Sequence, residues 1–234
     1  AVVYCGTNII PQLSISNLGA LPLTSIRLHA AVDDGTPVVT NLTLNLPSLQ
    51  ETTISGNAIT VAPGHHTVKL YTTLPNGIPD QRSINDTASM VFSVVGNANE
   101  PLVYGFETTA FPPQGWGIAN TSDVVAYNPV RVTNAAHSGT ASLKFDNYNY
   151  QLFGKSTMLV TPQLNIPLTA DSVKIAFWRA AAQYSSSNSD TLEILFSADC
   201  GQTYTSVYKK GGAELKTRPD FTTAEYIPTA DEWV

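Results

Sequence analysis

Few residues in this sequence of 234 residues have the types and spacing that catalysis requires. None of the histidines lies in an HExxH pattern, in which two histidines on one helix face hold zinc. A GxSxG nucleophile elbow is also absent, while a Ser/His/Asp triad stays open because its members need no fixed spacing. We therefore predict no catalytic residue in this chain. The histidines are His29, His65, His66 and His137.

Residues 197–204, SADCGQTY, fit the pattern Ser-x-Asp-x-Gly-x-Thr-aromatic. The stretch resembles the Asp-box of bacterial sialidases, a hairpin turn that lies away from their catalytic residues. The resemblance implies that Asp199 accepts backbone N–H groups while the aromatic residue packs beneath the turn. A glycine in the turn supplies a backbone angle that other residues adopt only with strain. We predict a structural turn rather than a glycosidase site, formed by Ser197, Asp199, Gly201 and Tyr204.

The composition indicates a β-protein with many turns. Charged residues make up 13% of the chain, about half of the usual share, and Thr, Val, Gly, Pro and Asn are abundant. The net charge of −6, from 12 basic and 18 acidic residues, argues against a nucleic-acid partner. No apolar run has the length of a membrane span, and the first residues, AVVYCGTNII, are unlike a signal peptide. Cys5 and Cys200 leave three states open: one long-range bridge, two unpaired thiols, or partners outside the chain.

Residues 1–96 are expected to form an Ig-like β-sandwich. Turn residues such as Asp33-Asp34-Gly35 and Pro75-Asn76-Gly77 separate short runs with apolar residues at alternate positions. About seven short strands in roughly 100 residues are typical of an immunoglobulin-type sandwich. The runs are residues 12–19, 25–32, 38–46, 52–61, 66–74 and 89–95.

Residues 105–234 are expected to form a second β-sandwich, a jelly roll, after a small, polar linker at 97–104. Longer runs at 171–184, DSVKIAFWRAAAQY, and at 190–208 predict longer strands than those of the first module. Only KKGGAELKT, residues 209–217, has the pattern of a single helical turn. The predicted fold class is therefore all-β.

Short motifs of the second module follow one another in an order found in one group of domains. They are Phe106-Glu107, Phe111-Pro112-Pro113 with Gly115-Trp116, His137-Ser138-Gly139, Thr161-Pro162, and Asp190-Thr191-Leu192 before Asp199-Cys200-Gly201. In this order they resemble MAM-like, galactose-binding-like jelly rolls, called choice-of-anchor J or cleaved-adhesin domains, of bacterial surface proteins exported by the type IX pathway. The first module, through residues 9–28 and 63–86, is similar to the Ig-like domains that often precede them.

The resemblance implies calcium at the start of the jelly roll. In related domains the Glu after Phe ligates calcium, together with carbonyl groups of a loop that corresponds to residues 134–139 and a carboxylate of the last strand. Calcium takes about six to eight oxygen ligands. The alternative is that the Glu caps a turn. The candidate ligands are Glu107, Asn134, Ser138 and Asp146.

Aromatic residues in polar surroundings offer a second kind of site. Stacked on one surface, they form a platform for sugar rings, while the alternative is that they pack in the core. The predicted platform is Trp116, Tyr148 and Tyr150, chosen from a wider set of aromatic candidates that also includes Tyr127, Phe153 and Tyr184. Three Asp-Ser/Thr-apolar triplets also resemble the O-glycosylation signal of the same bacterial group, with Thr87, Ser172 and Thr191 as acceptors.

Taken together, the resemblance implies a non-catalytic segment of a secreted or outer-surface bacterial protein that binds a protein or a glycan. The alternative is an accessory C-terminal region of a secreted zinc metalloprotease whose catalytic domain lies outside this chain. Family members continue for several strands beyond a segment like 221–234. We therefore expect a fragment whose second domain is completed by continuing polypeptide or by a partner chain.

Overall fold

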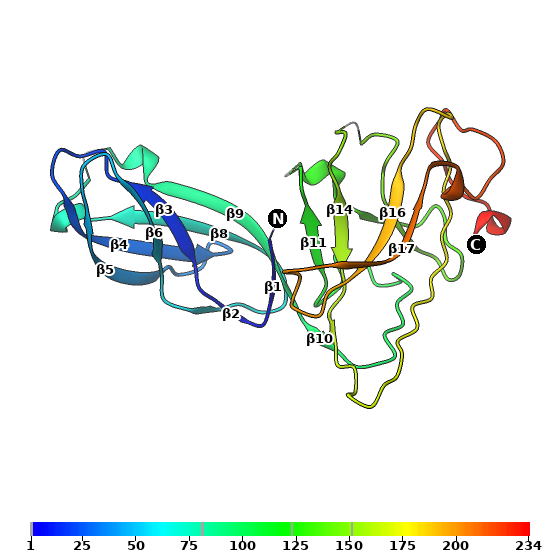
Figure 1. The fold of residues 1–234 in the computed structure, drawn as a ribbon, viewed down its shortest axis with the longest axis horizontal. Helices are drawn as coiled ribbons and strands as arrows, with labels where there is room; N and C mark the ends of the chain where they lie inside the picture. The colour runs from blue at the N-terminus through cyan, green and yellow to red at the C-terminus, as the bar shows by residue number, and fades with distance from the viewer. Residues whose placement is uncertain (1, 81, 123, 151) are drawn as a thin grey trace. The chain divides into compact units, whose positions relative to one another are not determined.

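The structure, a computed structural model, describes residues 2–80, 82–122, 124–150 and 152–234. The chain divides between Gly96 and Asn97 into two compact units, which are described one at a time (Figure 1). Strands are the main regular elements of both units, and within the described ranges the helical elements are short 3₁₀ turns. These are η1 (Pro75–Gly77), η2 (Ser83–Asn85), η3 (Val125–Tyr127), η4 (Gly212–Glu214) and η5 (Ala230–Glu232). The chain is therefore all-β, as predicted, and η4 lies in the stretch expected to make one helical turn.

The first unit contains a five-stranded sheet in the order β1-β9-β8-β4-β5. Strand β1 runs parallel to β9, and the other neighbours are antiparallel. Two short ladders, β3-β6 and β2-β7, complete the unit. The strands are β1 (Val2–Cys5), β2 (Asn8–Ile9), β3 (Gln12–Ser16), β4 (Leu23–Val32), β5 (Val38–Leu46), β6 (Glu51–Ser55), β7 (Ile59–Thr60), β8 (Gly64–Thr73) and β9 (Thr87–Val95). All six predicted runs contain strands, while β1 and β2 were not predicted.

Alternate side chains of these strands build one hydrophobic core. Leu28 of β4 and Val94 of β9 are fully buried, and Phe92 is 2% exposed. Ile54 of β6 packs in the same cluster, so the β3-β6 ladder covers one face of the large sheet. Along β5 the burial alternates residue by residue, because successive side chains of a strand point to opposite faces. The first unit is therefore a β-sandwich.

The predicted turns of the first unit are held by their own side chains. Asp33 adopts a φ of 50°, and its carboxylate accepts the Thr67 N–H at 2.9 Å and faces Nδ1 of His66 at 2.6 Å. Asn76, with a φ of 50°, accepts the Thr24 N–H at 2.7 Å. Asp and Asn tolerate the left-handed region better than other non-glycine residues, which is why these turns could be predicted.

The second unit is built from two-stranded ladders. Three are antiparallel, β11-β14, β12-β13 and β16-β17, and one is parallel, β10-β15. The strands are β10 (Asn97–Ala98), β11 (Gly117–Asn120), β12 (Val130–Val132), β13 (Ser142–Lys144), β14 (Thr157–Val160), β15 (Gln163–Leu164), β16 (Thr191–Phe196) and β17 (Thr205–Gly211).

Two predictions for the second unit are corrected by these ladders. The stretch 97–104, expected to be a linker, begins as β10 and pairs with residues 163–164 of the same unit. The run 171–184, expected to be a long strand, contains no residue assigned to a strand. It lies in the long yellow segment between β15 and β16 in Figure 1. Its alternating sequence is that of a strand, but the described residues provide no neighbouring strand to pair with residues 172–178.

Candidate functional site

Glu107, the first candidate calcium ligand, holds the turn that contains Thr140. Its carboxylate accepts the Thr140 N–H, 3.1 Å from each oxygen, the Thr140 hydroxyl at 2.6 Å and the Ala141 N–H at 3.3 Å. Arg131 fixes the backbone beside it, because its side chain donates to the carbonyl oxygens of Phe106 at 2.5 Å and of Glu107 at 3.2 Å. The hydrogen bonds that the carboxylate accepts from Thr140 and Ala141 lower the pKa of Glu107, and the bond from the Thr140 hydroxyl has the largest effect. The arrangement stabilises an ionised carboxylate against the loop.

Gly139 gives the carboxylate its place in this turn. The glycine has a φ of +70°, and a Cβ on it would overlap Oε1 of Glu107. Backbone N–H groups that point at a carboxylate suit an anion and repel a cation. The contacts of Glu107 therefore fit the turn-capping alternative, and calcium has only the remaining lone pairs of the carboxylate.

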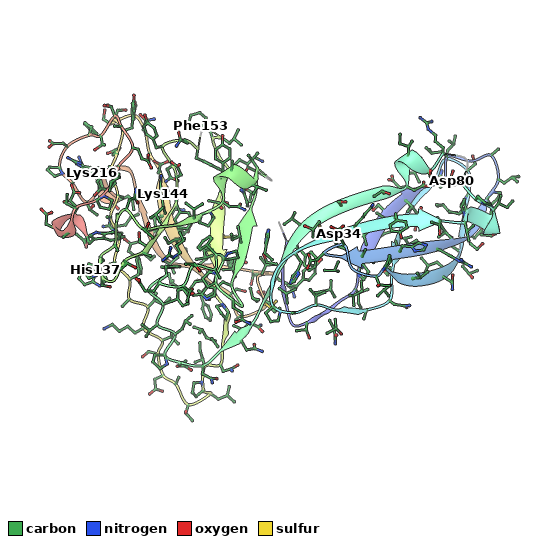
Figure 2. The ribbon with its side chains drawn as sticks, turned by 180° about the vertical axis from the view of Figure 1, so that it is seen from behind. Asp34, Asp80, His137, Lys144, Phe153 and Lys216 are labelled. Atoms are coloured by element: carbon green, nitrogen blue, oxygen red, sulfur yellow. The ribbon has the colours of Figure 1, made fainter. Side chains whose placement is uncertain are left out.

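The other candidate calcium ligands are not joined to Glu107 in the parts of the chain that the structure describes. Asp146 lies 3.4 Å from Nζ of Lys144 and accepts the side-chain N–H of Asn149 at 2.9 Å. Burial raises the pKa of Asp146, but the hydrogen bonds of Asn149 and the charge of Lys144 outweigh it and lower the pKa. Lys144, labelled in Figure 2, also pairs with Glu225. Asn134 and Ser138 are exposed.

Among the described residues, no group of three or more His, Cys, Asp or Glu side chains is arranged to hold a metal ion. Part of the loop 134–139 is already engaged, because the carbonyl oxygen of Ala135 accepts the Ser142 hydroxyl at 2.7 Å. Calcium at Glu107 stays a prediction.

Asp199 lies in the loop between β16 and β17, where the sequence places a turn. Its carboxylate accepts the Thr203 N–H at 2.8 Å, the Thr203 hydroxyl at 2.5 Å and the Ser197 hydroxyl at 2.8 Å. The Ser197 oxygen in turn accepts the Gly201 N–H at 2.7 Å. Since each of these bonds stabilises the ionised form, first those of Thr203, the pKa of Asp199 falls to about 2. The contacts are those of a turn, and the carboxylate is occupied within the loop.

Of the remaining two residues of this motif, Gly201 allows the backbone conformation of the turn and Tyr204 packs against the turn. Gly201 has a φ of +76°, and a Cβ on it would lie 2.6 Å from the hydroxyl oxygen of Tyr204. Tyr204 therefore lies against the turn, but 42% of it is exposed. The predicted aromatic packing beneath the turn is thus only partial.

The three aromatic residues predicted as a glycan platform have different surroundings. Trp116 is only 8% exposed, with ring centroids 5.2 Å from Tyr104 and 6.1 Å from Phe106. It belongs to the core, which corrects its assignment to the platform. Tyr150 packs edge-on against Tyr127 at 4.5 Å, and its hydroxyl is buried. A platform of all three rings is therefore not formed.

Tyr148 is the exposed member of that set, and its neighbour is Tyr184. Tyr148 is 47% exposed, Tyr184 is 49% exposed, and their ring centroids are 6.4 Å apart. The hydroxyl of Tyr148 lies 3.5 Å from the carbonyl oxygen of Thr223. The two rings form an exposed aromatic pair on the second unit, and large amphipathic rings of this kind are enriched at binding surfaces.

Sequence reasoning missed a second aromatic group. The ring of His137, labelled in Figure 2, stacks on Trp178 with centroids 4.0 Å apart and planes 9° apart. Trp233 meets His137 edge-on at 6.3 Å. Trp178 is 60% exposed. The available signal was the alternating run 171–184, which predicted a long strand rather than an exposed segment without a strand partner.

The remaining candidates are placed as follows. Thr87, Ser172 and Thr191, the predicted O-glycosylation acceptors, are exposed, and their modification stays a prediction.

His66 faces Asp33 through Nδ1 and the carbonyl oxygen of Ala62 through Nε2 at 2.8 Å. Neither cysteine is free, which excludes two unpaired thiols.

The fold and these features define an all-β, two-unit chain with capped turns and exposed aromatic side chains. Within the described residues, no helix has the length and apolar character of a membrane span. No protein-family model matches the chain, and the comparison with curated proteins finds no relative.

Two solved structures are similar to part of the chain. The crystal structure of the CARDB domain of the PF1109 protein from Pyrococcus furiosus, in complex with di-metal ions, shows 21% identity and a TM-score of 0.31. The similarity covers 40% of this chain and 84% of that chain. A solution NMR structure of the same domain shows 18% identity and a TM-score of 0.32, over 41% of this chain and 87% of that chain. The fold assignment rests on the strands and their pairing described above.

Proposed function

We propose that this chain is a non-catalytic binding segment of a secreted or cell-surface bacterial protein, of the kind that the choice-of-anchor J and cleaved-adhesin resemblance implies. The exposed pair of Tyr148 and Tyr184 carries the proposal. Paired rings with half of their surface in solvent offer apolar faces and hydroxyl groups to a ligand at little cost in side-chain entropy.

The ligand is a glycan or a protein surface, because rings stack on the apolar faces of sugars and also anchor protein interfaces. In this proposal the first unit acts as an Ig-like spacer. The role is the same if the parent protein is an adhesin or a secreted zinc metalloprotease, because an HExxH motif would lie outside this chain.

A binding screen tests the proposal. The full chain is applied to a glycan array and to a panel of purified extracellular proteins, and the best ligand is titrated against variants. Tyr148→Ala and Tyr184→Ala are expected to weaken binding about tenfold or more. The matched control is Phe153→Ala, which removes a 96% exposed ring of the same unit (Figure 2). Loss of binding in the control alone, or no ligand in either screen, contradicts the proposal.

Calcium stabilisation and completion of the second unit by a further strand belong to the same proposal. The support for calcium is that the pKa of Glu107 is lowered and that its carboxylate lies beside Gly139, at the end of the loop 134–139. Bound metal raises the melting temperature of the native state, so calcium is expected to raise it relative to chelator. The rise should disappear in Glu107→Gln and persist in Asp80→Asn, which changes an exposed acid of the first unit. The proposed O-glycans at Thr87, Ser172 and Thr191 are tested by intact mass of the natural protein.

A further inference from the structure

Residues 172–178, SVKIAFW, are an extended segment without a partner. They run without a turn or bend, and all are exposed. No backbone hydrogen bond joins them to any other residue that the structure describes. Unpaired N–H and C=O groups in an extended segment are the template on which another strand adds. We call residues 172–178 the acceptor segment.

Side-chain directions along the acceptor segment are those of a strand. The ring of Phe177 faces Tyr208 of β17, edge-on at 5.2 Å, whereas the next residue, Trp178, stacks on His137. Neighbouring side chains thus go to different partners, as they do where they point to opposite faces of a strand. The apolar residues on the Phe177 side are half exposed: Val173 49%, Ile175 53% and Phe177 40%.

Arg179, which follows the acceptor segment, shows which edge of the segment is already paired further along and in which direction the paired chain runs. The Arg179 N–H donates to the carbonyl oxygen of Val234 at 2.9 Å, and the Val234 N–H donates to that of Arg179 at 3.0 Å. Two residues that exchange both bonds form the hydrogen-bonded pair of an antiparallel ladder. Two positions on, the carbonyl oxygen of Ala181 accepts the Thr217 N–H at 2.8 Å. One edge is therefore paired from residue 179 onward and unpaired before it.

We propose that the acceptor segment takes up one antiparallel strand that continues directly from Val234. The reciprocal pair with Arg179 already places the next position along that strand opposite Trp178, and the antiparallel direction carries it on toward Ser172. Its side chains next to Val173, Ile175 and Phe177 are apolar or β-branched, since such cross-strand pairs stabilise a sheet. This inference rests on the proposed completion of the second unit and does not depend on the ligand.

The proposal predicts that protection of the backbone amides alternates from residue to residue along the acceptor segment. Backbone groups of alternate residues in a strand point to the same edge, so those of Val173, Ile175 and Phe177 share the edge of Arg179. Those of Lys174 and Ala176 point to the opposite edge. An added strand on the Val234 edge therefore protects the odd-numbered amides and leaves the even-numbered ones exposed.

The experiment extends the full chain after Val234 by a strand of alternating Thr and Val, as long as the acceptor segment. A Gly-Ser extension of the same length is the control, because it has little tendency to form a strand. Amide hydrogen exchange is expected to slow about tenfold or more at residues 173, 175 and 177 in the Thr-Val protein only. The melting temperature should rise in parallel.

Two proline variants of the Thr-Val protein test the edge. Ile175→Pro removes an N–H from the Val234 edge, whereas Ala176→Pro removes one from the other edge. Both change an exposed residue without a backbone partner, so both should fold. Ile175→Pro is expected to abolish the slowed exchange, and Ala176→Pro to keep most of it.

Three results overturn the inference: equal exchange in the two extended proteins, equal slowing at odd-numbered and even-numbered amides, and equal effects of the two prolines. Slowing that appears only in a concentration-dependent dimer also overturns it, because the strand would then come from a second copy. Ligand binding by Tyr148 and Tyr184 is measured separately. Failure there refutes the proposed function and leaves the exchange result unaffected.

Discussion

Replacing Gly139 by alanine is expected to destabilise the second unit through two separable effects. The first is backbone strain, because a left-handed φ of +70° costs an L-residue about 1–2 kcal/mol. The second is overlap of the new Cβ with the Glu107 carboxylate, which moves away only by giving up its bonds to Thr140 and Ala141. Overpacking of this kind costs about 1–3 kcal/mol. We expect a total of about 2–5 kcal/mol.

Gly154→Ala is the matched control. Gly154 has a φ of +72°, and nothing lies within 4 Å of the position of a Cβ, so this variant should show the backbone cost alone. All 3 tryptophans of the chain, Trp116, Trp178 and Trp233, belong to the second unit, so urea unfolding followed by tryptophan fluorescence reports on that unit.

The double variant Glu107→Ala/Gly139→Ala removes the overlapping group. The two substitutions should therefore be less damaging together than the sum of their separate effects. Equal unfolding free energies for Gly139→Ala and Gly154→Ala would refute the assignment of Glu107 as the cap of this turn.

Three further outcomes are expected. In the folded protein the pKa of Asp199 is about 2, below its value in the unfolded chain. The carboxylate therefore stabilises the fold at pH values above the unfolded pKa, and this stabilisation is lost as the pH falls through about 2. Asp199→Asn should remove this acid dependence from unfolding followed by tryptophan fluorescence. Burial, followed by the charge of His66, lowers the pKa of His65, so the first unit should lose stability as the pH falls below the ordinary histidine value, and His65→Gln should flatten this loss in amide-exchange measurements. Leu28→Ala should cost the first unit about 2–5 kcal/mol in urea unfolding followed by circular dichroism, and a loss below 1 kcal/mol, as a rough limit, contradicts its place in the core.

The first unit could be predicted well because its sequence pattern and its burial have the same period. Alternation around Leu28 of β4 and along β5 coincides with the buried face of the sheet, and turn chemistry at Asp33 and Asn76 marks the strand ends. Strands β1 and β2 escaped prediction because they are short, and β1 depends on parallel pairing with a strand far along the chain. Such pairing leaves no local signal.

In the second unit the aromatic residues show the limit of sequence reasoning. Trp116 stands between two glycines and Trp178 follows Phe177 in an alternating apolar run, yet Trp116 is buried against Tyr104 and Trp178 is largely exposed on His137. The difference depends on which segments meet in the fold rather than on nearby residues. Glu107 shows the same limit. The sequence predicts that a loop lies near its carboxylate, but it does not predict that the N–H groups of Thr140 and Ala141 donate to that carboxylate.

The same contrast explains why capped turns and an unpaired segment occur together in the second unit. A turn such as the one around Asp199 satisfies its polar groups within a few residues, so it forms whatever the rest of the sheet does. Residues 172–178 have no local partner, because extended backbone groups are satisfied only by a neighbouring strand. Their β-branched and aromatic residues are those that a paired strand uses. At residues 172–178 the strand-like sequence and the observed exposure disagree. The proposed strand would remove this disagreement, and the pairing of Arg179 with Val234 gives the edge on which it would add.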